Sequence, residues 1–317
     1  MEGEPIARDI QGQGGDRPVP ERGGHHRDPV TGTMAERLSV ILDRPVRRAA
    51  LAGSSHDWEI TYAELDDGTR LFVKALPRRA PATGVLSAEA RGLVWLGQAF
   101  GSPALRPLAW DERIVVLPWV TEDEPTPAAA ERLGRQLAGL HLTGAAQYGA
   151  PWEGYIGPLP MDNTPSGHWP TFFAEQRLRP YLQRALDQGS LTPADGRVIE
   201  RVVDSVSELA GPTEPPARVH GDLWSGNVLW RGPDAVLIDP AAHGGHRESD
   251  LAMLSLFGLP YLDRVRDAYN EVAPLAEGWR DRVALHQLHP LLVHVCLFGA
   301  AYRTTALDAA RTALRGR

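Results

Sequence analysis

The chain has 317 residues, of which 43% are hydrophobic and 23% are charged, a composition typical of a globular protein with one large or two moderate domains. Its net charge of −7 argues against a broad nucleic-acid surface, and no apolar run approaches the length of a membrane span. The single cysteine, Cys296, cannot form an internal disulfide, which fits a reducing compartment and favours a cytoplasmic protein.

Residues 1–33 differ from the rest of the chain. They are rich in Gly, Pro, Asp, Arg and Gln and have almost no apolar periodicity, so we expect a disordered extension. The segment lacks the apolar core of a signal peptide. A more ordinary sequence begins at Met34, so the extension is either a genuine tail or a start-site artefact.

The next part of the chain is predicted to form strands around one helix. Alternating apolar residues predict strands over residues 48–53, 57–65 and 69–76, with a hairpin turn at Asp66-Asp67-Gly68. We expect Ser87 to cap a helix over residues 88–98. Two further strands are predicted, over residues 105–110 and 113–117.

Lys74, on the third predicted strand, is the only lysine among 33 lysine and arginine residues. Kinases place a phosphate-binding lysine on such a strand, and a compact ammonium is not replaced by arginine there. The alternative is a surface lysine whose stem covers apolar neighbours. Glu89 could pair with Lys74, or it could be a favourable first-turn carboxylate. Pro118-Trp119-Val120 would then connect two lobes and contact an adenine edge, although Pro118 offers no N–H.

The second half of the chain is mainly helical in this prediction. Helices are expected over residues 128–142, 169–186 and 193–209, the last with Thr192 as its N-cap. His141 is expected to be a packed or capping residue. Residues 148–168 read as a long irregular segment, which is often functional inside a compact domain. The aromatic residues in or beside it, Trp169 among them, either line a sugar site or pack in the core.

The strongest motif is His220-Gly221-Asp222-Leu223-Trp224-Ser225-Gly226-Asn227, followed by Ile238-Asp239-Pro240. Phosphoryl transfer in kinase-like folds needs one Asp that takes the proton of the attacking hydroxyl, here Asp222. It also needs oxygen ligands for magnesium, here Asn227 and Asp239. The alternative is an ordinary turn in which the Asp and Asn side chains bond their own backbone.

A His- and Gly-rich segment follows Asp239 and leads into an apolar helix over residues 251–257. Asp250 could accept hydrogen bonds from the backbone of the loop that carries Asp222, or it could cap this helix. His243 and His246 do not have the companions that metal-ligand spacing requires.

These residues together resemble one family, the fructosamine kinase (ketosamine kinase) family, which belongs to the aminoglycoside phosphotransferase-like kinases. The resemblance covers roughly residues 45–303. It rests on the Asp222 motif and on several shorter matches: Phe72-Val73-Lys74, Glu89-Ala90-Arg91-Gly92-Leu93, Tyr155-Ile156-Gly157, Gln176-Arg177-Leu178, Gly245-His246-Arg247-Glu248-Ser249-Asp250 and Leu292-Val293-His294.

The resemblance implies an α+β, two-lobed, protein-kinase-like fold. Residues 34–117 would form a small N-lobe with an antiparallel sheet, residues 118–120 a hinge, and residues 121–317 a larger, mainly helical C-lobe. It also implies that ATP and Mg²⁺ serve to phosphorylate a sugar hydroxyl of a ketosamine. The phosphorylated adduct is unstable, so the reaction would help to deglycate amines.

The resemblance further implies roles for single residues. Asp222 would be the base, and Asn227 with Asp239 the magnesium ligands. Lys74 with Glu89 would position the phosphates, and Pro118, Trp119 and Val120 would contact the nucleotide. Substrate contacts are expected from Trp224, Trp169 and His246, and structural support from His220 and Asp250.

Two departures from the family pattern concern the nucleotide. Residues 53–57, which would cover the phosphates, contain one glycine where such loops are often richer, and the connector begins with Pro118 where many relatives have an acidic residue. Two other functions stay open: a phosphotransferase for another acceptor such as an aminoglycoside or choline, and a pseudokinase-like binding module. The preferred ketosamine and the oligomeric state are left open by the sequence.

Overall fold

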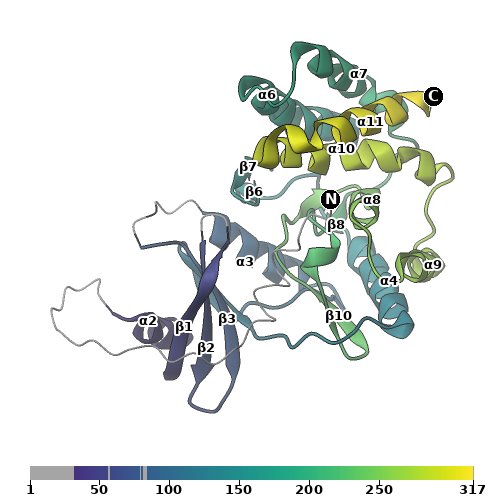
Figure 1. Ribbon diagram of the computed structural model, residues 1–317. Coiled ribbons are helices and arrows are strands. Elements are labelled where there is room, and N and C mark those ends of the chain that lie inside the picture. Colours follow the sequence, from purple (N-terminus) through teal and green to yellow (C-terminus); the bar gives the residue numbers. More distant parts are fainter. Residues whose placement is uncertain (1–31, 56–57, 79, 81–83, 317) are drawn as a thin grey trace. The chain divides into compact units, whose positions relative to one another are not determined.

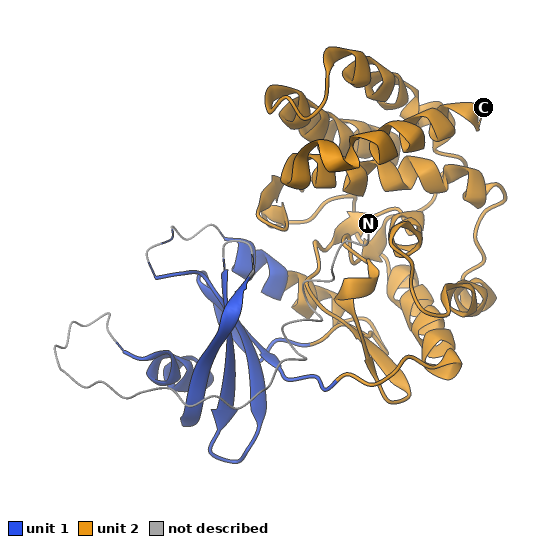
Figure 2. Cartoon of the chain, in the orientation of Figure 1, with its two compact units in different colours: residues 1–90, 106–121 blue, residues 91–105, 122–317 orange. Residues whose placement is uncertain are grey.

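The computed structural model describes residues 32–55, 58–78, 80 and 84–316. Most of the predicted disordered extension, and His56 and Asp57 of the predicted phosphate loop, lie outside these residues. The chain divides into two compact units, each described here by itself (Figure 2). Unit 1 comprises residues 1–90 and 106–121, and unit 2 comprises residues 91–105 and 122–317. The lobe and hinge boundaries inferred from the sequence stay predictions, and residues 91–105 group with unit 2.

Unit 1 is built on an antiparallel sheet of five strands in the order β1-β2-β3-β5-β4 (Figure 1). Its strands are β1 (Val46–Ser55), β2 (Trp58–Leu65), β3 (Arg70–Ala75), β4 (Ala109–Asp111) and β5 (Ile114–Pro118). The predicted hairpin turn joins β2 to β3, where Leu65 N–H donates to Thr69 O at 2.9 Å. The Asp67 carboxylate accepts from Thr69 N–H at 3.0 Å, a local bond that favours this turn.

Two helices complete this part of the chain. α2 (Met34–Leu42) is absent from the sequence-based prediction, although Thr33 and Glu36 form a capping box that marks its start. Its Leu38 is fully buried among side chains of the sheet. α3 (Val85–Leu96) begins earlier than expected, so Ser87 is not its cap and donates instead to Asp111 O at 3.1 Å.

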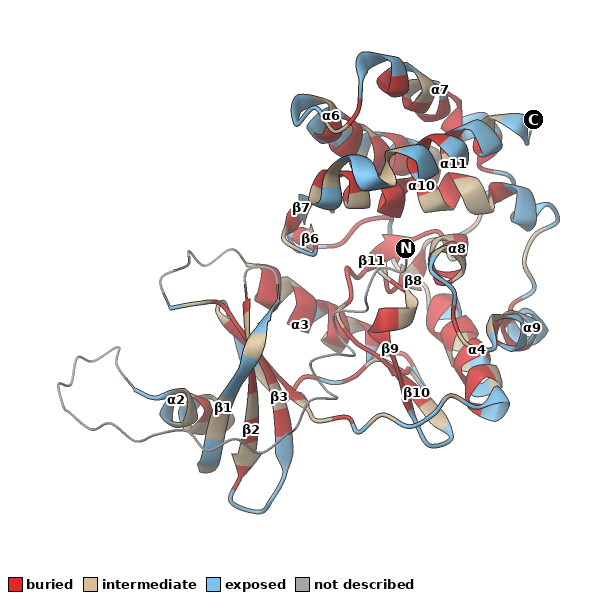
Figure 3. Ribbon diagram, viewed as in Figure 1, coloured by how far each residue is buried: buried red, intermediate tan, exposed pale blue. Residues whose placement is uncertain are grey.

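In unit 2 a helix pair carries a short hairpin. α4 (Pro127–Leu142) packs against α9 (Leu262–Val272) and also contacts β10 (Asp234–Leu237), which pairs with β9 (Val228–Arg231). The first three residues of β9 are buried, and the hairpin tip from Arg231 onward is exposed (Figure 3). β10 ends two residues before Asp239.

The remaining helices of unit 2 surround a second core. Residues 169–186, predicted as one helix, form a continuous helical path with a π-helical segment in its middle. The predicted helix over residues 193–209 is confirmed with its Thr192 cap. The elements are α5 (Trp169–Phe172), η1 (Phe173–Leu178), α6 (Arg179–Asp187), α7 (Pro193–Leu209), α8 (Glu248–Leu256), α10 (Trp279–Phe298), η3 (Gly299–Tyr302) and α11 (Arg303–Arg315).

Residues 148–168 are more regular than predicted. They contain the hairpin of β6 (Gly154–Ile156) and β7 (Leu159–Met161). The buried Arg177 side chain donates to Asn163 Oδ1 at 2.8 Å and to Asp162 O, so a distant helix fixes this segment. Such a contact lies between residues far apart in sequence, and a local pattern therefore does not reveal it.

Two further features bear on the site. β8 (Ala217–Val219) pairs with β11 (His243–Gly245) and brings the two ends of the functional segment together. Among the described residues, one helical stretch, Trp279–Arg315, is long and apolar enough to cross a membrane, and 56% of its most apolar window is buried inside the protein. That stretch contains α10 and α11, and most of their buried apolar residues belong to the core of unit 2.

The contact between α4 and α9 generates a stability prediction. A Cβ on Gly134 would lie 2.2 Å from Val265 O, whereas a Cβ on Gly139 of the same helix meets nothing within 4 Å. Gly134→Ala should therefore lower the free energy of unfolding by about 1–3 kcal/mol through overpacking. Gly139→Ala, the matched control, should raise it by about 0.5–1 kcal/mol, as alanine does inside helices. Urea unfolding measures both, and equal effects of the two substitutions would contradict the close approach.

Candidate active site

His220 begins the loop that carries the Asp222 motif, and it is fully buried. Its Nε2 lies 2.9 Å from Ile238 O, and its Nδ1 lies 3.3 Å from Asp222 N. Since a carbonyl only accepts, Nε2–H donates to Ile238 and Nδ1 accepts from Asp222 N–H, which makes the ring neutral. Burial lowers the His220 pKa and favours the same state. This imidazole thus joins the backbone next to Asp239 with the backbone of Asp222.

Asp250 holds the same loop from the other side. Its Oδ2 accepts from His220 N–H at 2.7 Å, and its Oδ1 accepts from Gly221 N–H at 2.9 Å. His141 Nε2 donates to Oδ2 at 3.1 Å, while His141 Nδ1 lies 2.9 Å from the Tyr269 hydroxyl. Burial alone would raise the Asp250 pKa, but the bonds and charges of its neighbours bring it below its usual value. Asp250 lies in the first turn of α8 rather than at its cap.

Gly221 occupies a position that excludes a side chain. Its φ is +82°, and a Cβ there would lie 2.2 Å from Ala241 O. A residue with a side chain would be strained by the backbone conformation and would also collide with this carbonyl. The loop therefore reaches its hydrogen bonds to Asp250 because this position is glycine.

Asn227 connects the two candidate acidic residues. Its Nδ2 donates to Asp222 O at 2.8 Å and lies 3.3 Å from Asp222 Oδ2 and 3.4 Å from Asp239 O. Because Nδ2 faces the protein, Oδ1 is the amide atom of Asn227 that can act as a ligand. Asp239 has a φ of +53°, which is uncommon for a residue with a side chain and often marks a functional position. A carboxylate and an amide oxygen are donors that Mg²⁺ prefers, so Asp239 and Asn227 fit this ion.

Unit 1 contains the expected lysine and glutamate pair. Lys74 Nζ on β3 lies 2.8 Å from Glu89 Oε2 on α3, and the two side chains are only 4% and 8% exposed. The ammonium also lies 5.1 Å from the centre of the Trp58 ring, a cation–π distance. The alternative of an exposed, snorkelling lysine is thus wrong. A carboxylate held this way fixes the direction of the ammonium group.

The predicted connector offers fewer backbone donors than its length suggests. Trp119 N–H donates to Arg70 O at 3.0 Å, and the Trp119 ring meets Tyr62 edge-on at 4.9 Å. Val120 is buried, and Pro118 has no N–H. The Trp119 amide is therefore engaged within unit 1 and is not available to an adenine edge.

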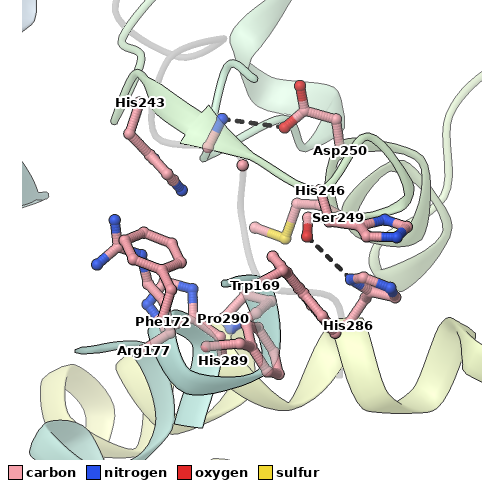
Figure 4. Close-up of a pocket in the computed structure, with 14 residues that line it drawn as sticks. Trp169, Phe172, Arg177, His243, His246, Ser249, Asp250, His286, His289 and Pro290 are labelled. Carbon is pink, nitrogen blue, oxygen red and sulfur yellow. Dashed lines mark hydrogen bonds between the residues drawn. The ribbon is translucent and has the colours of Figure 1, made fainter. Parts of the chain in front are cut away.

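Trp169 and His246, expected to contact the substrate, lie in the interior of unit 2. They line a small cavity of about 30 Å³ together with Arg177, His286 and His289 (Figure 4). Trp169 is 5% exposed and His246 3% exposed, which leaves neither side chain a face for a sugar. The core alternative for Trp169 is the correct one. The cavity is large enough to hold water but not a sugar.

An ion-pair network adjoins this cavity. Arg282 donates to both oxygens of Glu248, at 2.6 and 2.9 Å, and His286 Nε2 lies 3.4 Å from the same carboxylate. The ligand atoms of His246, Glu248 and His286 lie within 4.8 Å of one another, as in a metal site. The Arg282 guanidinium bonds to both oxygens of the Glu248 carboxylate, and its positive charge would repel a metal ion at this position. We therefore interpret the cluster as structural. Sequence spacing gives no sign of it, because His286 comes from a different helix.

The buried histidines predict how stability depends on pH. Burial lowers the pKa values of His243 and His246 to about 3, whereas an unfolded histidine titrates near about 6.5. Below pH 6.5 the unfolded chain therefore binds more protons, and stability falls as the pH is lowered. Each of these histidines should remove about 2 kcal/mol of unfolding free energy between pH 6.5 and pH 5. Glu248, with a pKa of about 2, loses its contribution only at lower pH.

Urea unfolding at pH 7.5, 6 and 5 tests this prediction. His246→Gln should reduce the loss of stability between pH 7.5 and pH 5 by about 2 kcal/mol. His168→Gln changes an exposed histidine and should leave the loss unchanged. A His246→Gln protein with the pH dependence of the original chain would show that His246 is protonated in the folded state.

Comparison of the sequence with known proteins identifies relatives of this chain. A sequence profile of the fructosamine kinase family matches residues 44–315. A probable ketoamine kinase of Synechocystis sp. is 33% identical over 294 residues, which cover 89% of this chain and 96% of that protein. A probable ketoamine kinase of Enterococcus faecium is 34% identical over 268 residues, covering 83% and 95% of the two chains.

Solved structures that resemble this chain indicate the same family. A Thermobifida fusca protein assigned as a fructosamine-3-kinase superimposes with a TM-score of 0.88 at 65% identity, covering 89% of this chain and 99% of that one. A macrolide 2′-phosphotransferase of Brachybacterium faecium, at 15% identity, has a TM-score of 0.57 over 86% and 95% of the two chains, and it shows the fold alone. The predicted protein-kinase-like α+β fold is confirmed. The chain belongs to the fructosamine kinase family and is a phosphotransferase of the kinase type.

Proposed function

We propose that this kinase transfers the γ-phosphoryl group of ATP to a sugar hydroxyl of a ketosamine. The observation that carries the proposal is the loop in which Asn227 bonds to the backbone of Asp222 at 2.8 Å and lies 3.4 Å from that of Asp239. The Asn227 amide therefore links the backbone of the two aspartates that phosphoryl transfer requires. The family relationship supports a ketosamine as the acceptor.

In the proposed reaction, the sugar hydroxyl oxygen forms a bond to the γ-phosphorus while the bond to the β,γ-bridging oxygen breaks. ADP leaves, and the hydroxyl proton passes to the Asp222 carboxylate. Mg²⁺, held by Asn227 and Asp239, would neutralise phosphate charge. His220 and Asp250 are positioning residues, because they fix the backbone of the loop and do not face the reacting atoms.

Lys74 would act on the nucleotide. Its ammonium is directed by Glu89 at 2.8 Å, and a compact charge of this kind suits the oxygens of the α- and β-phosphates. Phosphorylated ketosamines are unstable, so the biological outcome would be removal of sugar from glycated amines. Dependence on ATP and the single, buried cysteine both favour a cytoplasmic site of action.

Phosphate transfer to a fructose-derived ketosamine is the direct test. With ATP and Mg²⁺, the original chain should phosphorylate this acceptor, and Asp222→Asn should lower kcat by about 10²–10⁴-fold because the general base is lost. Asp234→Asn, at the start of the neighbouring β10, is the matched control and should retain activity. Equal activity of Asp222→Asn would refute the assigned base. If phosphate is transferred faster to an aminoglycoside or to choline than to the ketosamine, that compound is the preferred acceptor.

Because Lys74 is the only lysine, an amine-acylating ATP probe has a single side-chain target. We expect the probe to label Lys74 and the label to be lost when ATP is added in excess. Lys74→Arg keeps the charge but should lower kcat/KM for ATP by about 100-fold, since a guanidinium does not replace the compact ammonium. The free N-terminal amine is the internal control, and its labelling should not respond to ATP. Labelling of Lys74 that ATP leaves unchanged would remove this residue from the nucleotide site.

A further inference from the structure

A row of aromatic side chains begins in the Asp222 loop and continues over the end of α10. Trp224, two residues after Asp222, meets Phe257 edge-on with ring centres 6.0 Å apart. Phe257 lies 5.1 Å from the ring of His294 and 6.5 Å from that of Tyr302. We call the row the aromatic ridge and define it by five residues, Trp224, Phe257, His294, Phe298 and Tyr302.

The local structure explains why these rings meet. His294, Phe298 and Tyr302 are spaced four residues apart, which places such side chains on one side of a helix. α10 ends at Phe298, and Gly299, with a φ of +69°, turns the chain into η3. Tyr302 consequently lies 4.8 Å from His294 and 5.8 Å from Phe298. His294 Nδ1–H donates to Pro290 O at 2.7 Å, so the orientation of its ring is fixed.

The ridge presents apolar surface rather than charge. Phe257 and Phe298 are 38% and 47% exposed, and Trp224 and Tyr302 are half-buried. Burial lowers the pKa of His294, so all five rings are uncharged at neutral pH. Single exposed apolar residues are normal on protein surfaces, but a contiguous set marks a place of interaction.

The acceptor of the proposed reaction has two parts, a sugar and the group contributed by the amine. The reacting hydroxyl must reach Asp222, and Trp224 lies next to it in the loop. A sugar bound beside Asp222 would lie at the start of the ridge, and an amine-derived group attached to it could continue along Phe257 and Phe298. Neither side chain offers a charge to an ionic group, whereas both offer edges and faces to another ring.

We propose that the aromatic ridge binds the amine-derived part of the ketosamine and selects acceptors in which this part is aromatic. The inference rests on the proposed function and adds the chemical class of the substituent. Each ring contact of this kind increases affinity by roughly 2- to 12-fold. The ring contacts should change the affinity for the acceptor and leave the affinity for ATP unchanged.

Two ketosamines that differ only in the amine test the inference, fructosyl-benzylamine and fructosyl-methylamine, each measured with saturating ATP. The original chain should have a kcat/KM for the benzyl compound about 10-fold above that for the methyl compound. Phe257→Ala and Phe298→Ala should each lower this ratio by about 3- to 10-fold. Both side chains are exposed, so the variants should fold, which thermal unfolding verifies. Phe100→Ala, at a fully exposed phenylalanine, should keep the original ratio.

The outcomes separate this inference from the proposed function. If both compounds are phosphorylated with equal kcat/KM, or if neither ridge variant changes the ratio, the ridge does not select the amine and the kinase assignment still stands. An equal fall for both compounds in the variants would also overturn the inference, because it would place the effect on the sugar. Absence of transfer to either compound, under conditions in which the protein is folded and labels with the ATP probe, would overturn the proposed ketosamine acceptor itself.

Discussion

The carboxylate of Asp250 is the group on which the geometry of the site depends. It is buried, and it accepts hydrogen bonds from the backbone of His220 and Gly221 and from the His141 side chain. A buried carboxylate without these donors would be costly, and the backbone groups without the carboxylate would be unsatisfied. Each therefore stabilises the other. The loop with Asp222 is consequently held by Asp250 on α8 and by Ile238, while His141 on α4 holds Asp250 in turn.

Each of the two units contains a buried cationic side chain that is paired with a buried carboxylate. In unit 1 the buried ammonium of Lys74 is balanced by Glu89, and in unit 2 the buried Arg282 is balanced by Glu248. Both pairs avoid the large cost of an isolated buried charge. They differ in what the cation can do: the Arg282 guanidinium is engaged with both oxygens of its carboxylate, whereas an ammonium on the central strand β3 is suited to a phosphate.

Burial divides the aromatic residues of unit 2 into two groups with different roles. Trp169 stacks on Phe173 and packs against His246 and His286 inside the protein. Trp224 stays half-buried and opens the row of exposed rings beyond the Asp222 loop. The former group surrounds His246, whose pKa is lowered by burial and which stabilises the fold only while it is unprotonated. The latter is the group that we propose to contact the acceptor.

The sequence by itself determined the family, and it indicated the residues of the candidate site. The spacing of Asp222, Asn227 and Asp239, and a lone lysine on a strand, are local patterns. The strands β1, β2, β3 and β5 and the capped helix α7 also depend on neighbouring residues and were predictable, whereas the strand expected over residues 105–110 is confined to Ala109–Asp111. Tertiary structure decided three other matters: the hairpin inside residues 148–168, the burial of Trp169 and His246, and the exposure of the ridge. Each results from contacts between residues far apart in the chain. A sequence shows that an aromatic ring is present, but the helices that pack around the ring decide whether it faces the core or the solvent.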